Sequence, residues 1–286
     1  MEGYNNMDKI NVGTIQFTRV LGKKKENIEK AIIFINEAAK KGAKIISLPE
    51  LFSTGYFPYG EIKNEYFEWA ENIPGPTTNK ICDIAKDLNV WIIAPIYEID
   101  AISFVHYNTA AIISPQKGVV GLMRKRHIPS VQPYMVEKYY YAPGNIKYPV
   151  FDIDGWKIAI SICYDRHFPE TFKLSALHGA HIVFSVNNTP TPRSERMWYA
   201  EIEVASSSNG IYIVQNNAVG EEMKFFGKSF ITDPSGGIIG QLASEEGVLV
   251  KELEKKEIAT ARIYYKPLWD TNWSDFGLIN EKMGQL

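Results

Sequence analysis

The chain has 286 residues, with 31 Lys or Arg against 33 Asp or Glu, so its formal net charge is −2. This length allows one large domain or two small ones, and the charge balance argues against nucleic-acid binding, which usually shows a strongly basic domain. Two cysteines cannot build a disulfide framework. The opening MEGYNNMDKI does not have the apolar stretch of a secretory signal, and no apolar run reaches the roughly 18 residues of a membrane span. We therefore expect a cytoplasmic protein that does not act on membranes.

Apolar segments of strand length alternate with amphipathic segments from the start of the chain. After a strand at 9–17, the spacing of Ile28, Ala31 and Ile35 predicts a helix over 24–41, which Gly42 ends at a C-cap position. Further along, the same criteria predict a helix at 77–88 and strands at 44–48, 90–96, 108–114 and 119–124.

The second half continues this alternation. A hairpin is predicted over 151–162, because Asp154 and Gly155 form a turn between two apolar runs. Helices at 168–179 and 194–207 follow, with strands at 181–186, 211–216, 228–232, 238–242 and 248–252 and a turn at 233–237. With no linker and no evident repeat, we expect one α/β domain over residues 1–286. From about Tyr264 the chain is aromatic and irregular, and we expect this tail to pack on the body or on a neighbouring subunit.

Three chemically reactive side chains follow predicted strands. Glu50 comes after the strand at 44–48, Lys125 after the strand at 119–124, and Cys163 after the second strand of the hairpin. In α/β folds, ligands gather at the carboxyl ends of strands. A thiol, a carboxylate and an ammonium can act there as one unit: the thiol attacks, the carboxylate takes its proton, and the ammonium stabilises the negative oxygen that forms.

Each of these residues also has a structural explanation. A cysteine after an apolar strand is usually a small core residue. Glu50 can cap the segment that follows Pro49, and Lys125 can belong to a solvated basic edge, since Arg124 and Arg126 flank it. Taken one at a time, the three residues favour these structural roles.

Together, the three segments resemble the signatures of the nitrilase, or carbon–nitrogen hydrolase, superfamily. Glu50 stands in a Pro-Glu-Leu-Phe context, Lys125 in an Arg-Lys-x-His-x-Pro element, and Cys163 in an Ile-Cys-Tyr-Asp-x-x-Phe-Pro-Glu element. The resemblance runs from about Ile10 to about Ile258, and three ordered motifs are a far more specific signal than one. It implies a nitrilase-like four-layer αββα sandwich that assembles as a homodimer or a larger homo-oligomer.

The resemblance also assigns catalytic roles. It implies that Cys163 attacks an amide-type carbonyl of a small molecule and that Glu50 passes the thiol proton to the leaving amine. Lys125 and the backbone N–H of Tyr164 are expected to hold the oxyanion. Glu137, in MVEKYYYAPGN, matches a second glutamate that holds Lys125. No metal ion or organic cofactor is implied.

Arg166 gives the most specific indication of the substrate. Cys-Tyr-Asp-Arg-His is similar to branches that hydrolyse N-carbamoyl amino acids, in which an arginine here meets the substrate carboxylate, a role that suits its planar fork. Asn188 lies in a segment that resembles the corresponding loop of N-carbamoyl-D-amino-acid amidohydrolases. The alternative is that Arg166 pairs with Glu170 or Asp165 and only braces the nucleophile segment.

Several functions fit these features. We favour an amidohydrolase acting on a small N-carbamoyl amino acid, as in β-ureidopropionase or N-carbamoyl-D-amino-acid amidohydrolase. N-carbamoylputrescine amidase, nitrilase, aliphatic amidase and ω-amidase are alternatives in the same superfamily. A non-catalytic oligomeric scaffold is a hypothesis of another class, which the complete set of reactive residues argues against.

His178 and His181 are interpreted as structural residues. The expected walls of the substrate pocket are aromatic: Tyr56, with Phe52, Phe57, Tyr59, Tyr134 and Trp198.

Overall fold

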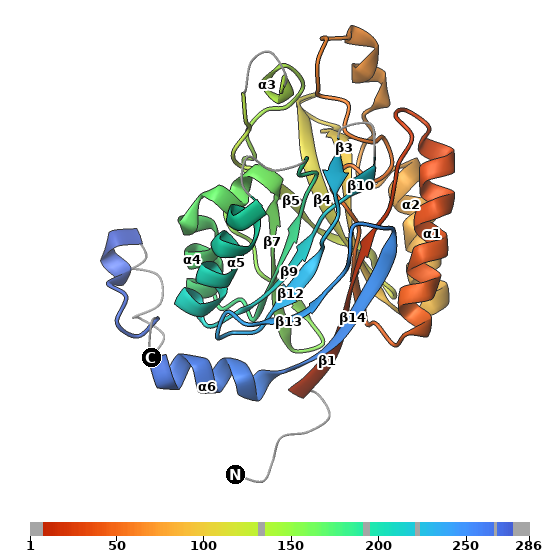
Figure 1. Cartoon of the computed structure of the whole chain (residues 1–286). Coiled ribbons are helices and arrows are strands. Elements are labelled where there is room, and N and C mark those ends of the chain that lie inside the picture. Colours follow the sequence, from red (N-terminus) through yellow and green to blue (C-terminus); the bar gives the residue numbers. More distant parts are fainter. Residues whose placement is uncertain (1–7, 131–134, 191–194, 221–223, 266–267, 277–286) are drawn as a thin grey trace.

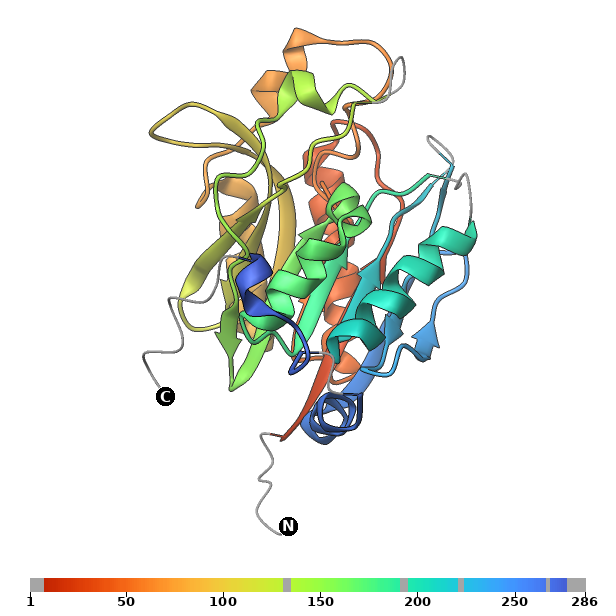
Figure 2. The same ribbon diagram turned by 90° about the vertical axis from the view of Figure 1, so that its left-hand side faces the viewer.

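The structure is a computed structural model that describes residues 8–130, 135–190, 195–220, 224–265 and 268–276. Two six-stranded sheets pack face to face, and helices cover the outer face of each sheet (Figure 1 and Figure 2). The predicted four-layer αββα sandwich is therefore confirmed. No helix in the described ranges has an apolar stretch long enough to cross a membrane.

The first sheet has the order β14–β1–β2–β3–β4–β5. Strands β1, β2 and β3 are parallel, and the other neighbours in this sheet are antiparallel. Helices α1 (Lys24–Lys40) and α2 (Pro76–Leu88) connect the parallel strands. The six strands are β1 (Lys9–Gln16), β2 (Ile45–Ser47), β3 (Trp91–Ile99), β4 (His106–Ser114), β5 (Gly118–Arg124) and β14 (Gly247–Glu254).

The second sheet has the order β13–β12–β9–β8–β7–β6. Strands β7, β8 and β9 are parallel, and the remaining neighbours are antiparallel. Helices α4 (Pro169–Leu177) and α5 (Glu195–Asn209) connect the parallel strands. The six strands are β6 (Phe151–Ile153), β7 (Trp156–Ile162), β8 (Ile182–Val186), β9 (Tyr212–Asn216), β12 (Phe230–Thr232) and β13 (Ile238–Gln241).

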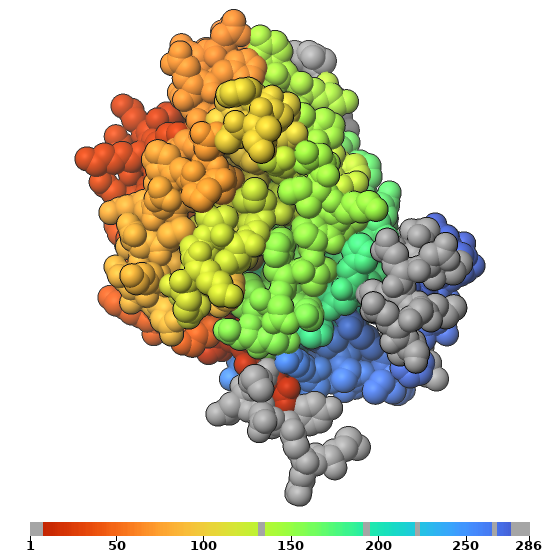
Figure 3. All heavy atoms as spheres, turned by 180° about the vertical axis from the view of Figure 1, so that it is seen from behind, coloured from red at the N-terminus to blue at the C-terminus, as the bar shows by residue number. Residues whose placement is uncertain are grey.

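The two sheets share one pattern of connections. In each, three parallel strands joined by two helices are followed by two antiparallel strands, so β1–α1–β2–α2–β3–β4–β5 corresponds to β7–α4–β8–α5–β9–β12–β13. Figure 3 shows residues of the first half, in red to yellow, on one side of the molecule and most of the second half on the other. The repeat lies in the topology, and no repeat is evident in the order of the residues.

The central strands are buried on both faces, which explains their continuous apolar runs. In β7, Ile158, Ile160 and Ile162 belong to the core between the sheets, whereas Ala159 packs beneath α4 and α5. On the other side of the sandwich, Ala31 of α1 contributes with Ile35 and Ala38 to the core between the helices and the first sheet. These contacts place the carboxyl ends of both sets of parallel strands at fixed positions.

Most predicted elements are confirmed within two residues at each end. The larger difference is in β3, which continues three residues beyond the predicted end at 96. Strand β12 begins two residues after the predicted start at 228. Lys228 has a φ of 55°, in the left-handed region, so it cannot continue a strand.

Other elements were not predicted. Helix α6 (Lys255–Tyr265) follows β14 and has the charged sequence KKEIATARIYY. Among its described side chains only Ile258 and Ala261 are buried, so its apolar stripe is too weak to predict a helix. The expectation of irregular chain from Tyr264 is wrong at its first two residues, which end α6. Leu268, further along, packs in the hydrophobic core between helices α4 and α5 and the second sheet. The remaining unpredicted elements are η2 (Asn64–Trp69), α3 (Glu137–Tyr140), η3 (Cys163–His167), η4 (Trp273–Phe276) and the hairpin of β10 (Val219–Gly220) with β11 (Phe225–Phe226).

Candidate active site

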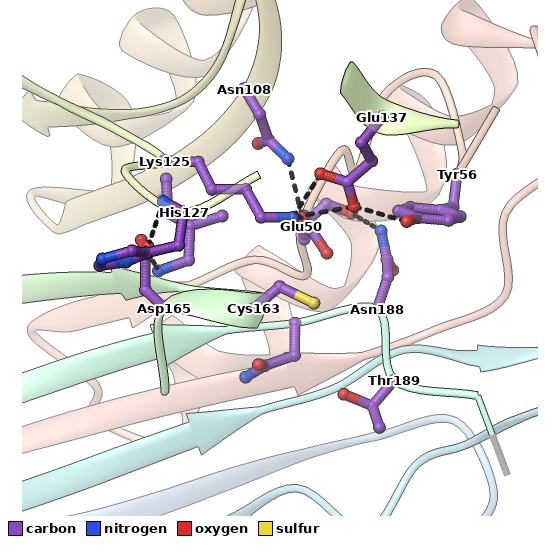
Figure 4. Close-up of polar contacts among 12 residues, drawn as sticks. Glu50, Tyr56, Asn108, Lys125, His127, Glu137, Cys163, Asp165, Asn188 and Thr189 are labelled. Atoms are coloured by element: carbon purple, nitrogen blue, oxygen red, sulfur yellow. Dashed lines mark hydrogen bonds and ion pairs between the residues drawn. The ribbon is translucent and has the colours of Figure 1, made fainter. Parts of the chain in front are cut away.

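The three reactive residues converge at one edge of the sandwich. Glu50 follows β2 and Lys125 follows β5, so both come from the first sheet, whereas Cys163 follows β7 of the second sheet. All three side chains are buried, and Figure 4 shows them facing the same space between the sheets. The structure therefore brings together the thiol, the carboxylate and the ammonium that the sequence predicted as a unit.

The Glu50 carboxylate is held on one side only. Its Oε1 accepts hydrogen bonds from Asn108 Nδ2 at 2.7 Å and from Lys125 Nζ at 3.1 Å. Its Oε2 is buried and has no hydrogen-bond partner within the described part of the chain. A fixed carboxylate with one unused oxygen is suited to accept and return a proton.

Glu137 lies at the start of α3 and completes the charged cluster. Lys125 Nζ donates to both of its oxygens, at 2.9 and 2.7 Å, and the Tyr56 hydroxyl donates to Oε1 at 2.5 Å. Burial raises the pKa of Glu137 and the positive charge of Lys125 opposes that shift. Tyr56, predicted as a substrate-binding residue, thus lies against the charged cluster with its hydroxyl directed to Glu137 (Figure 4).

Cys163 occupies a strained turn between β7 and α4. Its φ is 49°, in the left-handed region that non-glycine residues rarely adopt, and it begins the short helix η3. Burial, together with the negative charge of Glu50, raises the pKa of the Cys163 thiol to about 12, against the opposing effect of Lys125 and Arg166. The raised pKa favours the protonated thiol, so an attack by Cys163 would need a base to remove its proton. Tyr164, the expected oxyanion residue, is the second residue of the same short helix.

Asn188 supports the glutamate from the second sheet. Its Nδ2 donates to the backbone oxygen of Glu50 at 2.8 Å, and Arg19 Nη1 donates to that same oxygen at 2.8 Å. The Asn188 Oδ1 is buried, and no described group donates a hydrogen bond to it. The residue predicted to bind substrate therefore also fixes the segment that carries Glu50.

Arg166 already has a carboxylate partner within the chain. Its Nε lies 3.3 Å from Glu201 Oε2 of α5, and its Nη1 donates to the Cys163 carbonyl at 3.2 Å and to Asn187 Oδ1 at 3.3 Å. The guanidinium also lies over the Trp198 ring. The bracing alternative named Glu170 or Asp165 as the partner, and the structure has Glu201 in that place.

Sequence reasoning missed two residues at this site. Asn108 holds Glu50, and Asp165 connects the nucleophile turn to the segment after Lys125. Asn108 is a buried amide just before the apolar run of β4, which is the signal that could have identified it. Of the expected pocket walls, Tyr134 lies outside the described residues, and Trp198 is buried beside Phe226 and Phe230 in the core under α5.

The two histidines of HGAH make local contacts with their neighbours. His178 Nδ1 lies 3.0 Å from the carbonyl oxygen of Tyr148, and His181 Nδ1 accepts the backbone N–H of Lys157 at 3.2 Å. Burial lowers the pKa of His181 to about 4. Across the described ranges, no three His, Cys, Asp or Glu side chains are grouped to hold a metal ion.

Comparison with known proteins agrees with this geometry. The sequence model of the family described as carbon-nitrogen hydrolase matches residues 11–263. The chain belongs to the carbon–nitrogen hydrolase family. Among curated relatives of this hydrolase, a nitrilase of Pyrococcus abyssi is 34% identical over 89% of this chain and 93% of its own length. An N-carbamoylputrescine amidase of Solanum lycopersicum is 33% identical over 82% of this chain and 83% of its own.

Solved structures show the same fold for this hydrolase. A carbon–nitrogen hydrolase from Helicobacter pylori G27 superposes with a TM-score of 0.86, covering 94% of this chain and 98% of the other at 23% identity. At that identity the likeness concerns the fold alone. The family membership establishes that the protein is a carbon–nitrogen hydrolase.

Proposed function

We propose that this protein hydrolyses the carbamoyl group of a small N-carbamoyl compound, with N-carbamoyl amino acids as the first candidates. The observation that carries the proposal is the buried cluster in which Lys125 bridges Glu50 and Glu137 beside the Cys163 thiol. The relatives supply the substrate class, because one that is 33% identical is named an N-carbamoylputrescine amidase.

In the proposed reaction, Cys163 Sγ attacks the carbamoyl carbon while Glu50 accepts the thiol proton. The negative oxygen that forms is held by the Lys125 ammonium and the backbone N–H of Tyr164. Glu50 then gives its proton to the leaving nitrogen, so the amine departs and the carbamoyl group remains on Cys163 as a thioester of carbamic acid. Water, deprotonated by Glu50, cleaves this thioester, and Glu50 returns the proton to the departing thiolate. The released carbamic acid breaks down to ammonia and carbon dioxide.

Two candidate substrate classes differ in the charged group at the end of the substrate that is remote from the carbamoyl group, which we call its tail. A carboxylate tail is supported by Arg166, three residues after the nucleophile, whose fork matches a carboxylate in two hydrogen bonds. An amine tail is the second candidate, because the Arg166 guanidinium already lies 3.3 Å from Glu201 and a partnered guanidinium attracts a second carboxylate less strongly. The two candidates share all the chemistry at Cys163.

The proposal is tested by ammonia release from wild type and from Cys163→Ala. The compounds are N-carbamoyl-β-alanine, N-carbamoyl-D- and L-amino acids, N-carbamoylputrescine, an aliphatic amide, an ω-amide of a dicarboxylic acid and a nitrile. We expect turnover of carbamoyl compounds that disappears in Cys163→Ala and persists in Cys82→Ala, the other thiol. Turnover of amides or nitriles alone would discard the carbamoyl assignment and keep the nucleophile.

Arg166→Ala then decides between the tails. If Arg166 binds a carboxylate, its removal raises KM steeply for N-carbamoyl amino acids and much less for N-carbamoylputrescine. An equal effect on both compounds assigns Arg166 to bracing the nucleophile turn through its ion pair with Glu201 and its hydrogen bond to the Cys163 carbonyl.

A further inference from the structure

The catalytic residues are divided between two sheets, so the distance from Cys163 to Lys125 depends on what connects the sheets at this edge. Asp165, two residues after Cys163, makes such a connection. Its Oδ2 accepts the backbone N–H of Ile162 at 3.2 Å, next to the nucleophile, and its Oδ1 accepts the backbone N–H of His127 at 2.9 Å, two residues after Lys125. The Asp165 side chain is completely buried.

His127 strengthens this connection through its side chain. Its Nδ1 lies 2.8 Å from Asp165 Oδ1, and its ring stacks on Phe168, with centroids 3.6 Å apart and planes 10° from parallel. Phe168 directly precedes α4, so the ring is held by the same turn that carries the nucleophile. Figure 4 shows His127 and Asp165 beside Cys163 and Lys125, and the proposed reaction uses neither of them.

We propose that Asp165 and His127 form a positioning pair that holds the Cys163 turn of the second sheet against the Lys125 segment of the first. A single buried carboxylate that accepts hydrogen bonds from both segments fixes their separation at the catalytic edge, and bonds to a charged acceptor are among the stronger ones in proteins. Displacing catalytic groups by about 1 Å can cost roughly 10²-fold in rate. The pair therefore acts on kcat through the placement of Sγ and Nζ, and it does not touch the substrate.

Two substitutions at His127 distinguish the effect of its hydrogen bond to Asp165 from the effect of its stacking on Phe168. In His127→Asn, the amide nitrogen can take the place of Nδ1 and keep the bond to Asp165, whereas His127→Phe keeps an aromatic ring on Phe168 and loses the bond. We expect His127→Asn to retain kcat within threefold and His127→Phe to lower it at least tenfold, both with KM unchanged. The matched control is His178→Phe, which removes a comparable Nδ1 contact, to Tyr148, and is expected to leave kcat unchanged.

The turnover assay rests on the proposed function, so a second measurement does not need a substrate. Iodoacetamide alkylation of Cys163, followed by mass spectrometry, requires the thiol to lose its proton within the same site. Cys82 lies in α2, partly buried, and its alkylation in the same molecule reports general loosening of the fold. We expect His127→Phe and Asp165→Asn to change the ratio of the Cys163 to the Cys82 rate at least fivefold, and Asp165→Asn to lower kcat about 10²-fold.

The pair is refuted if His127→Phe equals wild type in both readouts, or if His127→Asn is as impaired as His127→Phe. It is also refuted if both cysteines are alkylated faster in proportion, since that result assigns the residues to overall stability. If no compound of the panel is turned over by wild type, the proposed function fails, and the alkylation ratio still decides the positioning role.

Discussion

The Lys125 ammonium donates to both oxygens of the Glu137 carboxylate, at 2.9 and 2.7 Å, inside a site closed to solvent. Burial alone would lower the pKa of Lys125, but the negative charges of Glu137 and Glu50 outweigh that effect and raise the pKa above its usual value. Lys125 is therefore a permanent ammonium that balances two buried carboxylates, and it supplies a fixed positive charge where the oxyanion is proposed to form.

Replacing this ammonium is expected to destabilise the fold as well as abolish turnover. Lys125→Met leaves Glu50 and Glu137 buried without a cation, and breaking a buried ion pair costs about 3–5 kcal/mol. Urea unfolding followed by circular dichroism measures the loss. Adding Glu137→Gln to Lys125→Met removes one of the stranded charges, so the double variant is expected to regain part of the stability.

The control for that experiment is Lys9→Met, which removes surface ion pairs of the half-exposed Lys9 side chain with Glu252 and Glu254. Exposed pairs contribute little to stability, so its unfolding midpoint is expected to match wild type. A Lys125→Met variant as stable as Lys9→Met would contradict the view that the cluster is held by charge balance.

His181 predicts how stability responds to acid. Burial lowers its pKa from the usual value to about 4 in the folded chain. Since the unfolded chain then binds a proton at a higher pH than the folded chain does, this histidine lowers the free energy of unfolding as the pH falls from about 6.5 to 4. His181→Gln keeps an acceptor for the Lys157 N–H and cannot titrate. Its unfolding free energy, measured in urea at pH 7 and pH 4.5, is expected to fall less than that of wild type, and an equal fall in both proteins would contradict this role.

The sequence was sufficient for the parts of the fold that follow from local pattern. The strands that are buried on both faces appear as apolar runs. The reactive residues come after the ends of β2, β5 and β7, so their convergence could be predicted from the rule for strand ends. Helix α6 could not, because a helix that buries only a narrow stripe, with Ile258 and Ala261, has little periodicity to detect. The repeated topology could not be predicted either, because the two halves have the same connections between strands without a similar amino-acid sequence.

The reactive residues of the site could be predicted from the sequence, whereas the contacts that hold them in place could not. Glu50, Lys125 and Cys163 are identified by their chemistry and motifs. The pairing of Arg166 with Glu201, 35 residues further along the chain, depends on how α5 packs beside the nucleophile turn. Asp165 stands in the nucleophile motif, but its contacts with His127, 38 residues earlier in the chain, could not be predicted because they form only when the two sheets are brought together.

Gly144 is expected to be required for activity through the backbone of Lys125. Its N–H donates to the Lys125 carbonyl at 2.7 Å, and a Cβ placed on it would lie 2.3 Å from the Arg124 carbonyl oxygen. Gly144→Ala must therefore push the segment of Arg124 and Lys125 away and displace the Lys125 ammonium. Because a displacement of roughly 1 Å can cost about 10²-fold in rate, we expect kcat to fall about ten- to hundredfold.

Gly179→Ala serves as the comparison for Gly144→Ala. Gly179 ends the α4 segment with a φ of +96°, so alanine strains the backbone there, yet the added Cβ meets no neighbour. Gly179→Ala is expected to lower the unfolding temperature and keep kcat. A Gly144→Ala variant with wild-type kcat would show that the Lys125 segment tolerates the displacement.

The protonation state of Cys163 gives a prediction that links stability and mechanism. Burial and the charge of Glu50 raise the pKa of this thiol from about 9 to about 12. Because the raised pKa belongs to the folded state, the stabilisation is complete below pH 9 and is lost as the pH rises toward 12. Wild type is therefore expected to lose unfolding free energy between pH 9 and 11 faster than Cys163→Ala does, measured by urea unfolding at each pH.

Glu50→Gln separates ionisation of the thiol from catalysis. Without the negative charge of Glu50, the thiolate of Cys163 is expected to form at lower pH than in wild type, seen as absorbance at 240 nm after subtraction of the Cys163→Ala signal. Turnover is nevertheless expected to fall by about 10²–10⁴-fold, because the group that carries the proton to the leaving nitrogen is lost. If Glu50→Gln retained most of the wild-type kcat, the thiolate alone would be sufficient for attack, and Glu50 would have no role as the base.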